Sequence, residues 1–318
     1  MNGAWLPLAV LAYAMFAVTG VIDKVVVTKK ITNPLVMSFW VSFFGIWSAV
    51  ILVVGLLPLP LAQAFKFHAP SLGALGLITL AGITLQLALL ASYTALKWGE
   101  ATRVVSAIGA ATPVFALVFA FAILGEKLAP LSLLAFGLLL VGAVAMLVRR
   151  GIGSLLPFWL ALGSAGFSAL ETVIVKLVYA HNDFISSFAL LGMGNVVFCA
   201  VLILISSAVR HDLWGHKKKS SKKPAKRPSR SGQMLVLFNT VFGGLGVIIL
   251  NLALKLGPVS LVNAMKGLQY VGIFLIALLL SRTYPKLLKE EMTAQSMKQK
   301  VAGILIIGAG LALLTVAA

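Results

Sequence analysis

The polar residues best suited to ligand chemistry lie together in one apolar segment near the C-terminus. Lys266 follows Pro258 by eight positions, which places it about 12 Å into a helix that would start there. Asn263 precedes Lys266 by three positions, and Gln269 and Tyr270 follow it by three and four, so a continuous helix would carry all four on roughly one face. An ammonium group with amide and phenol donors suits a carboxylate or phosphate. These residues predict a binding site for a small anionic molecule.

Other polar residues interrupt apolar segments elsewhere, and each is a further candidate for substrate binding. They are Glu171, Gln86, Tyr93, Asn195 and Asn251. A polar group inside an apolar segment is costly, so it is a functional hypothesis by default. For the amides, a hydrogen bond between two helices is an equally good explanation. For Lys266, the architectural alternative is a pair with an acidic neighbour such as Glu171, or with backbone carbonyls.

Signatures of catalysis and of bound cofactors are missing from the sequence. The four histidines, at positions 68, 181, 211 and 216, lie in the expected loops, and no HExxH, CxxC or GxSxG pattern occurs. A GxxxxGK[ST] phosphate loop is also missing, so the chain is not expected to hydrolyse ATP. We therefore expect a protein that is not an enzyme and that has no catalytic residue, metal site or cofactor.

The composition requires a lipid environment for these residues. Hydrophobic residues make up 60% of the 318 positions and charged residues only 11%, with a mean hydropathy of +1.05. A membrane-spanning helix needs about 20 mostly apolar residues. The sequence contains ten such segments: Trp5–Val27, Pro34–Gly55, Ser71–Leu96, Ala101–Leu124, Pro130–Val148, Leu155–Val178, Phe184–Ala208, Gly232–Leu256, Pro258–Ser281 and Lys300–Val316. The predicted fold is an all-α integral membrane protein with ten transmembrane helices.

The chain is an internal repeat. ALKWG, which begins at Ala95, returns as ALKLG at Ala253, and FGLLLVGAVAML from Phe136 matches AGILIIGAGLAL from Ala302. We assign the first five-helix repeat to residues 1–150 and the second to 151–318. Because each repeat has an odd number of spans, the two are inverted in the membrane, which is a common transporter plan with the substrate site at the repeat interface. Ile108 occupies the position equivalent to Lys266, and this asymmetry favours a functional lysine.

Charge placement predicts the orientation. Most of the 26 Lys and Arg residues lie in loops after odd-numbered spans, which places those loops in the cytoplasm and both termini outside. The basic stretch from His216 to Gly232 lacks aromatic residues for base stacking, so we interpret the loop 211–232 as disordered and near anionic lipid, and not as a nucleic-acid site. We expect a multi-pass protein of a bacterial or archaeal plasma (inner) membrane, with the lipid bilayer and a small metabolite as partners and no nucleic acid.

The charged residues near the ends of spans have architectural interpretations. Lys24 and Lys176 are equivalent in the two repeats, as are Lys97 and Lys255, but inversion places the members of each pair on opposite faces. We expect these lysines to snorkel, with gate-forming ion pairs as the alternative. Glu126 precedes the span that starts at Pro130, where an acidic residue favours the start of a helix.

The first repeat carries the most specific family signals. The AxxxGxA pattern from Ala95 to Ala101, Pro113, LGEKL from Leu124 to Leu128 and the glycine-rich fifth span together resemble EamA-type members of the drug/metabolite transporter superfamily. This resemblance implies a helical basket around a central cavity, alternating access and transport of small metabolites without ATP. Asn263 and Lys266 are also similar to the Asn-x-x-Lys pattern of sugar-phosphate translocators, in which the lysine helps to hold phosphate.

Three functions are compatible with the sequence. The first is secondary transport of a small polar, anionic metabolite anchored by Lys266. The second is export of amphipathic or cationic compounds anchored by Glu171. The third is a membrane scaffold without transport, in which the fifth and tenth spans present small residues to partners; a homodimer through these two spans is compatible with any of the three.

Overall fold

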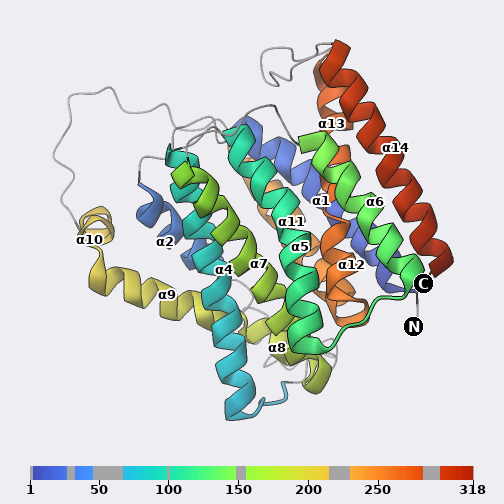
Figure 1. Ribbon diagram of the computed structural model, residues 1–318. Helices are drawn as coiled ribbons and strands as arrows, with labels where there is room; N and C mark the ends of the chain where they lie inside the picture. The colour runs from blue at the N-terminus through green and yellow to red at the C-terminus, as the bar shows by residue number, and fades with distance from the viewer. Residues whose placement is uncertain are drawn as a thin grey trace.

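The computed structural model describes residues 3–26, 33–45, 67–98, 101–147, 155–214, 230–281 and 294–317, and in these residues the secondary structure is helical (Figure 1). The helices are α1 (Trp5–Val26), α2 (Pro34–Phe44), α4 (Leu72–Trp98), α5 (Ala101–Leu124), α6 (Pro130–Leu147), α7 (Leu155–His181), α8 (Phe184–Leu190), α9 (Gly192–Ile205), α10 (Ser207–Trp214), α11 (Arg230–Leu256), α12 (Val259–Ala264), α13 (Gly267–Ser281) and α14 (Ala294–Ala317).

These helices have the length and composition of membrane spans. Six helical segments of the described residues are long and apolar enough to cross a bilayer, and four shorter apolar helices lie in α2, α6, α11 and α14. Large apolar side chains such as Phe121, Leu204 and Leu279 are exposed, as expected where lipid surrounds the protein. The prediction of an all-α membrane protein is therefore confirmed, while the arrangement of spans as ten in two inverted repeats remains a prediction.

The helices pack into one bundle in which segments distant in sequence are neighbours. α7 packs on both α4 and α5, α1 packs on both α11 and α13, and α6 packs along α14 (Figure 1). The largest buried apolar cluster joins α1, α5, α6, α11, α12 and α14 through residues such as Trp5, Leu139 and Met265. Helix α12 lies inside this cluster, so its position is fixed by contacts on several sides.

Two predicted spans are broken instead of continuous. The predicted span Phe184–Ala208 divides at Leu191 into α8 and α9, and α9 ends at Ile205. The predicted span Pro258–Ser281 divides at Met265 and Lys266 into α12 and α13. At the second break the amide of Lys266 bonds to the carbonyl of Asn263 at 3.1 Å, a tight turn that ends the regular α-helical ladder. The sequence showed no proline at either break, so it gave no signal for them.

The boundaries of the predicted basic loop also require correction. We expected disorder over 211–232, but α10 continues to Trp214 and α11 already begins at Arg230. Helix α10 is held because Val209 is buried and because the indole N–H of Trp40 in α2 donates to Asp212 at 2.9 Å. Residues 215–229, which carry most of the basic charge, lie outside the described residues, as do Lys29 and Lys30 and the predicted span beyond Gly45.

Two glycines allow α4 and α9 to touch through their backbones. A Cβ added to Gly82 would lie 2.7 Å from the Cα of Gly194, and one added to Gly194 would lie 2.5 Å from the Cα of Gly82. Atoms this close cannot be accommodated by a side-chain rotation, because the neighbouring atoms belong to the backbone. The two glycines therefore bring together two polar side chains: Gln86, one turn after Gly82, and Asn195, the residue after Gly194.

Candidate functional site

Lys266 lies at the break between two half-helices, α12 and α13, inside the bundle. Lys266 follows the first residue of α12, Val259, by seven positions, so it is about 11 Å from that end. Lys266 is half-buried, whereas Met265 before it is fully buried. A discontinuous helix at this depth leaves backbone groups unpaired and free for other partners, as in many transporter sites. The predicted anchor is thus on an irregular element enclosed by other helices.

Glu171 on α7 is the charged group that interacts with Lys266. Their opposite charges attract across the space between α7 and the α12–α13 break, and both side chains are half-buried. Within the described ranges, neither the ammonium of Lys266 nor the carboxylate of Glu171 forms a hydrogen bond or an ion pair within 4 Å. The two opposite charges thus interact without a direct bond between them. Buried charges are usually tightly paired, so this arrangement leaves both available to a ligand.

The other residues predicted with Lys266 do not share its face, because the helix breaks between them. The amide of Asn263 donates to the hydroxyl of Thr172 on α7 at 3.2 Å and is buried there. The amide of Gln269 reaches the carbonyl of Phe16 on α1 at 3.4 Å. The common face predicted for these residues is therefore wrong: Asn263 contacts α7, while Gln269 contacts α1.

Tyr270 is half-buried on α13 and interacts electrostatically with the phenol of Tyr13 on α1. It thus lies on the same side of the break as Gln269, near α1. The bonds of Asn263 and Gln269 give both amides a structural role in addition to any contact with a ligand. Tyr270 has no such bond among the described residues, which leaves its hydroxyl available.

Gln86 and Asn195 belong to a separate, buried hydrogen-bond network. The hydroxyl of Ser42 donates to Gln86 Oε1 at 2.6 Å, and Gln86 Nε2 donates to Asn195 Oδ1 at 2.7 Å. This chain links α2, α4 and α9, and Gln86 is 2% exposed. The helix-to-helix alternative therefore describes these two amides better than direct substrate contact does.

Tyr93, two turns further along α4, is half-buried and has an interaction partner.

Asn251 is also bonded across a helix pair. Its Oδ1 accepts a hydrogen bond of 2.8 Å from the hydroxyl of Tyr179, which connects α11 to α7. Tyr179 lies two turns from Glu171 on the same face of α7 and interacts with it electrostatically. Asn251 is thus connected to the Glu171 region through Tyr179, a residue that the sequence analysis did not single out.

Tyr13 is another residue that sequence analysis missed. The backbone N–H of Lys266 donates to the carbonyl of Asn263. In a regular α-helix it would donate to the carbonyl of Val262, which therefore lacks its usual helical donor. The hydroxyl of Tyr13 on α1 donates to that carbonyl at 3.0 Å, and Tyr13 is 4% exposed. Tyr13 therefore stabilises the break that carries Lys266. Its phenol in an apolar span was the available signal, since a buried tyrosine hydroxyl usually needs a partner.

We predict that Tyr13→Phe destabilises the break without disturbing the packing of the ring. The change leaves the Val262 carbonyl buried and unpaired, which costs about 1–3 kcal/mol of unfolding free energy. Thermal unfolding of the purified protein in detergent measures this loss. Thr315→Val is the matched control, because the hydroxyl of Thr315 bonds only to its own helix and is exposed. Equal stability of Tyr13→Phe and the control would remove the assigned role of Tyr13.

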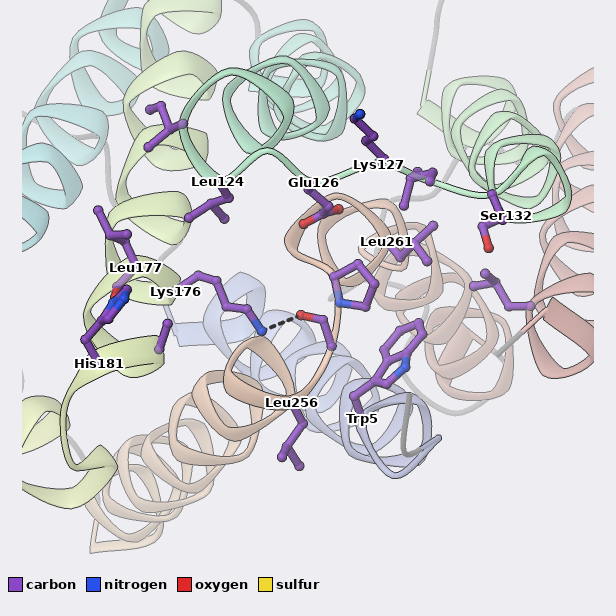
Figure 2. Close-up of a pocket in the computed structure, with 17 residues that line it drawn as sticks. Trp5, Leu124, Glu126, Lys127, Ser132, Lys176, Leu177, His181, Leu256 and Leu261 are labelled. Atoms are coloured by element: carbon purple, nitrogen blue, oxygen red, sulfur yellow. Dashed lines mark hydrogen bonds between the residues drawn. The ribbon is translucent and has the colours of Figure 1, made fainter.

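A cavity of about 560 Å³ lies at the end of the bundle nearest the start of α12 (Figure 2). The ends of α5, α7 and α11 and the starts of α1, α6 and α12 surround it, and its walls are mostly apolar. Trp5 and Leu314 both line it, so the start of α1 and the end of α14 share this end of the molecule. Leu261 brings α12 into the cavity wall, which connects the cavity to the helix that ends two residues before Lys266.

Glu126 and Lys176 clamp the corner between α11 and α12 at this cavity. The carboxylate of Glu126 accepts hydrogen bonds from the amides of Val259 at 2.9 Å and Ser260 at 3.3 Å, and also from the hydroxyl of Ser260. The ammonium of Lys176 donates to the carbonyl of Lys255 at 2.7 Å. It also donates to the carbonyl of Gly257 at 2.9 Å, the bond drawn as a dashed line in Figure 2. An anion thus caps the start of α12 and a cation caps the end of α11, which are the favourable ends for each charge.

This clamp corrects two sequence expectations. Glu126 was expected to start the span at Pro130, but it caps α12 instead, because Gly125, with φ +64°, turns the chain between α5 and α6 toward α12. Lys176 was expected to snorkel, but its ammonium is held by the carbonyls at the end of α11. The snorkelling of Lys24 stays a prediction, since its side chain lies outside the described residues.

The EamA-like transporter family matches this chain over residues 3–148. This match agrees with the resemblance predicted from the sequence, and the proteins of that family are membrane transporters. The matched residues include the LGEKL turn, whose glutamate caps α12.

The fold of this chain is found in solved structures. The crystal structure of another protein is similar to this chain with a TM-score of 0.66 and 16% sequence identity, and it covers 99% of this chain and 98% of its own. At this identity the likeness concerns the fold alone. No curated protein matches the chain by sequence.

Proposed function

We propose that this chain is a secondary transporter that moves a small polar, anionic metabolite by alternating access, without ATP. The observation that carries the proposal is the ammonium of Lys266, which stands at the α12–α13 break with neither a hydrogen bond nor an ion pair among the described residues. A cation kept unpaired at membrane depth is costly, so its retention indicates use. Lys266 would anchor the anion, with Tyr270 and Gln269 orienting it from the α1 side and Asn263 holding α12 against α7.

The remaining predicted residues contribute mainly through the scaffold of this site. Glu171 would face the bound anion, and Asn251 would position Tyr179 beside Glu171. Gln86 and Asn195 would fix the α4–α9 contact, while Tyr93 stays a candidate for direct contact.

The packing of the helices supports ten spans in two inverted repeats, 1–150 and 151–318. In that arrangement α1 is equivalent to α7, α4 to α11, α5 to the α12–α13 pair, and α6 to α14. The contact of α4 with α7 then corresponds to that of α11 with α1, and the contact of α5 with α7 corresponds to that of α13 with α1. The contact between α6 and α14 stays the same when the two repeats are exchanged, because these two helices are equivalent to each other. An exchange symmetry of this kind is expected for repeats related by a two-fold axis in the membrane plane.

The setting of the proposed transporter follows from the same predictions. Charge placement favours a bacterial or archaeal plasma membrane with both termini outside, which would put the cavity of Figure 2 at the outer face. A homodimer through α6 and α14 stays a proposal; Gly142 and Gly310 already pack against the partner helix within the chain, at Gly303 and Leu139, so a dimer would use the remaining outward faces.

Ligand-induced stabilisation of the purified protein tests the proposal. The panel contains inorganic phosphate, phosphorylated sugars, monocarboxylates and dicarboxylates. A ligand that binds only the folded state, at about 100 times its Kd, adds about 2.7 kcal/mol to the unfolding free energy. We expect an anion of the panel to stabilise the wild type, Lys266→Ala to lose the effect and Lys266→Arg to keep part of it.

The matched control is Lys97→Ala, which removes an exposed lysine that lies beside Trp98 at the end of α4. It should respond as the wild type does. Undiminished stabilisation of Lys266→Ala would contradict the proposal. Stabilisation by amphipathic cations that is lost in Glu171→Gln would replace the proposal with the cation exporter, and failure of every class would favour the scaffold.

A further inference from the structure

The start of helix α6, in the wall of the cavity of Figure 2, lacks the acidic group that its sequence provides. Glu126, which precedes α6, caps the start of α12 instead. Pro130, the first residue of α6, has no amide hydrogen, and the amides of Leu131 and Ser132 have no hydrogen-bond partner among the described residues. Two backbone donors at the positive end of the helix dipole therefore remain available.

The side chain of Ser132 is a second, independent sign of a ligand at this place. Ser132 lines the cavity and is only 8% exposed, yet its hydroxyl bonds to none of the described residues; Figure 2 shows it pointing away from α6. Hydroxyls inside helices usually bond to the carbonyl four positions earlier, as Thr112 does to Ile108 at 2.7 Å. Four positions before Ser132 the chain is not yet helical. An unpaired hydroxyl in a cavity is costly, so it indicates an acceptor on a ligand.

The donors at the start of α6 suit an anion. Free amides at a helix N-terminus form an anion site, and a neighbouring hydroxyl adds a donor to it. Among the described residues that line the cavity, the lysines are Lys127 and Lys176 and the carboxylate is that of Glu126. The oxygens of Glu126 are already bonded to α12, and it lies apart from Ser132 in Figure 2. The net charge of the cavity therefore favours an anionic group.

The remaining wall of the cavity is apolar and asks for a different part of the same ligand. Trp5, Leu124, Leu128, Leu261 and Leu314 belong to it. The cavity volume of about 560 Å³ lies within the range of about 300–1,000 Å³ that is typical of pockets for small organic molecules. A small polar anion would leave these side chains uncovered, whereas one apolar chain would bury them. The two chains of a phospholipid are too large for this space.

We propose that this cavity is a binding site for an amphipathic carboxylate with a single apolar chain. Its carboxylate accepts hydrogen bonds from the amides of Leu131 and Ser132 and from the Ser132 hydroxyl, and its chain packs against Leu261 and Leu314. Lys266 is not among the described residues that line the cavity, so this site is separate from the proposed transport site and does not depend on it.

Binding of radiolabelled decanoate to the purified protein tests the proposal. The protein is placed in nanodiscs of phosphatidylcholine at about pH 8, where a carboxylic acid of ordinary pKa is ionised, and binding to empty discs is subtracted. We expect saturable binding of about one decanoate per protein. An excess of unlabelled acetate, which has the head without the chain, or of decanol, which has the chain without the charge, should not compete.

Two variants remove the site in different ways. Ala129→Asp places a carboxylate directly before α6, where it accepts from the free amides, so it should raise the unfolding temperature of the empty protein and abolish decanoate binding. Ala180→Phe fills the cavity from α7 and should also abolish binding. Leu155→Asp and Ala122→Phe are the matched controls, at exposed positions that do not line the cavity, and should bind as the wild type does.

Ser132→Ala removes the hydroxyl alone and should weaken decanoate binding by about tenfold, as expected for one hydrogen bond to a charged group. Binding that survives both Ala129→Asp and Ala180→Phe overturns the proposal. Binding that is lost in Lys266→Ala but kept in Ala129→Asp places decanoate at the α12–α13 break and also overturns it. Displacement of decanoate by phosphatidylglycerol added to the discs assigns the cavity to lipid instead. Failure of the polar anions to bind at Lys266 leaves this site standing.

Discussion

The double variant Glu171→Leu with Lys266→Met is expected to be more stable than the wild type and to bind no anion. Removing a buried pair of opposite charges in favour of apolar side chains of similar size is often stabilising, by about 1–4 kcal/mol. The effect should be large here because the two groups lack direct hydrogen bonds in the described structure, so little is lost when they are removed. Thermal unfolding and anion-induced stabilisation measure the two halves of this expectation.

The single variants are the controls for this result. Lys266→Met leaves Glu171 without its opposite charge and should be less stable than the double variant. This experiment separates a functional pair from an architectural one, an alternative that the sequence leaves open. An architectural pair predicts that anion-induced stabilisation survives in the double variant, and that outcome would contradict the assignment of Lys266 as a substrate anchor.

Glu126→Ala is expected to lower both stability and anion affinity, although Glu126 lies away from Lys266. Its carboxylate caps the amides of Val259 and Ser260, and loss of a helix N-cap costs about 0.5–2 kcal/mol. Helix α12 has only six residues, so a loosened start shifts the end that carries Lys266. Glu126→Gln keeps an acceptor oxygen and should lose less. Thermal unfolding and the anion panel measure the two effects.

The neighbouring Lys127 provides the comparison, because it lies on the same turn and is exposed. Lys127→Ala should match the wild type in stability and in anion affinity. If Glu126→Ala lost stability but kept full affinity, the clamp would serve the fold alone. If it matched Lys127→Ala in both measurements, the hydrogen bonds of Glu126 to α12 would have no energetic role.

The sequence predicted the helices well because apolar length is what a bilayer demands of a span. The starts of α2, α5, α6, α7 and α8 agree with the predicted starts, and Pro34 and Pro130 marked two of them. The breaks at Leu191 and Lys266 could not be predicted, because they depend on contacts from other helices. At Lys266, the irregular backbone is tolerated since Tyr13, far away in the sequence, satisfies the carbonyl of Val262.

The sequence predicted the charged residues of the candidate site but not how the residues of the site are arranged. Lys266 and Glu171 stand out because an ionisable group inside an apolar segment is costly wherever the helix places it. The partners of amides depend instead on which helices meet, so Asn263 and Gln269 were wrongly given one face. The cap formed by Glu126 was equally hidden, because it joins two turns 133 residues apart.

Transport by the protein in sealed liposomes tests the central claim most directly. The anion that stabilises the wild type best is supplied outside in radiolabelled form, and its uptake is measured for the wild type, Lys266→Ala, Lys266→Arg and Lys97→Ala. The account predicts saturable uptake by the wild type and Lys97→Ala, reduced uptake by Lys266→Arg and background uptake by Lys266→Ala. Uptake by Lys266→Ala at the wild-type rate, with the variant folded as judged by its unfolding temperature, would contradict the account.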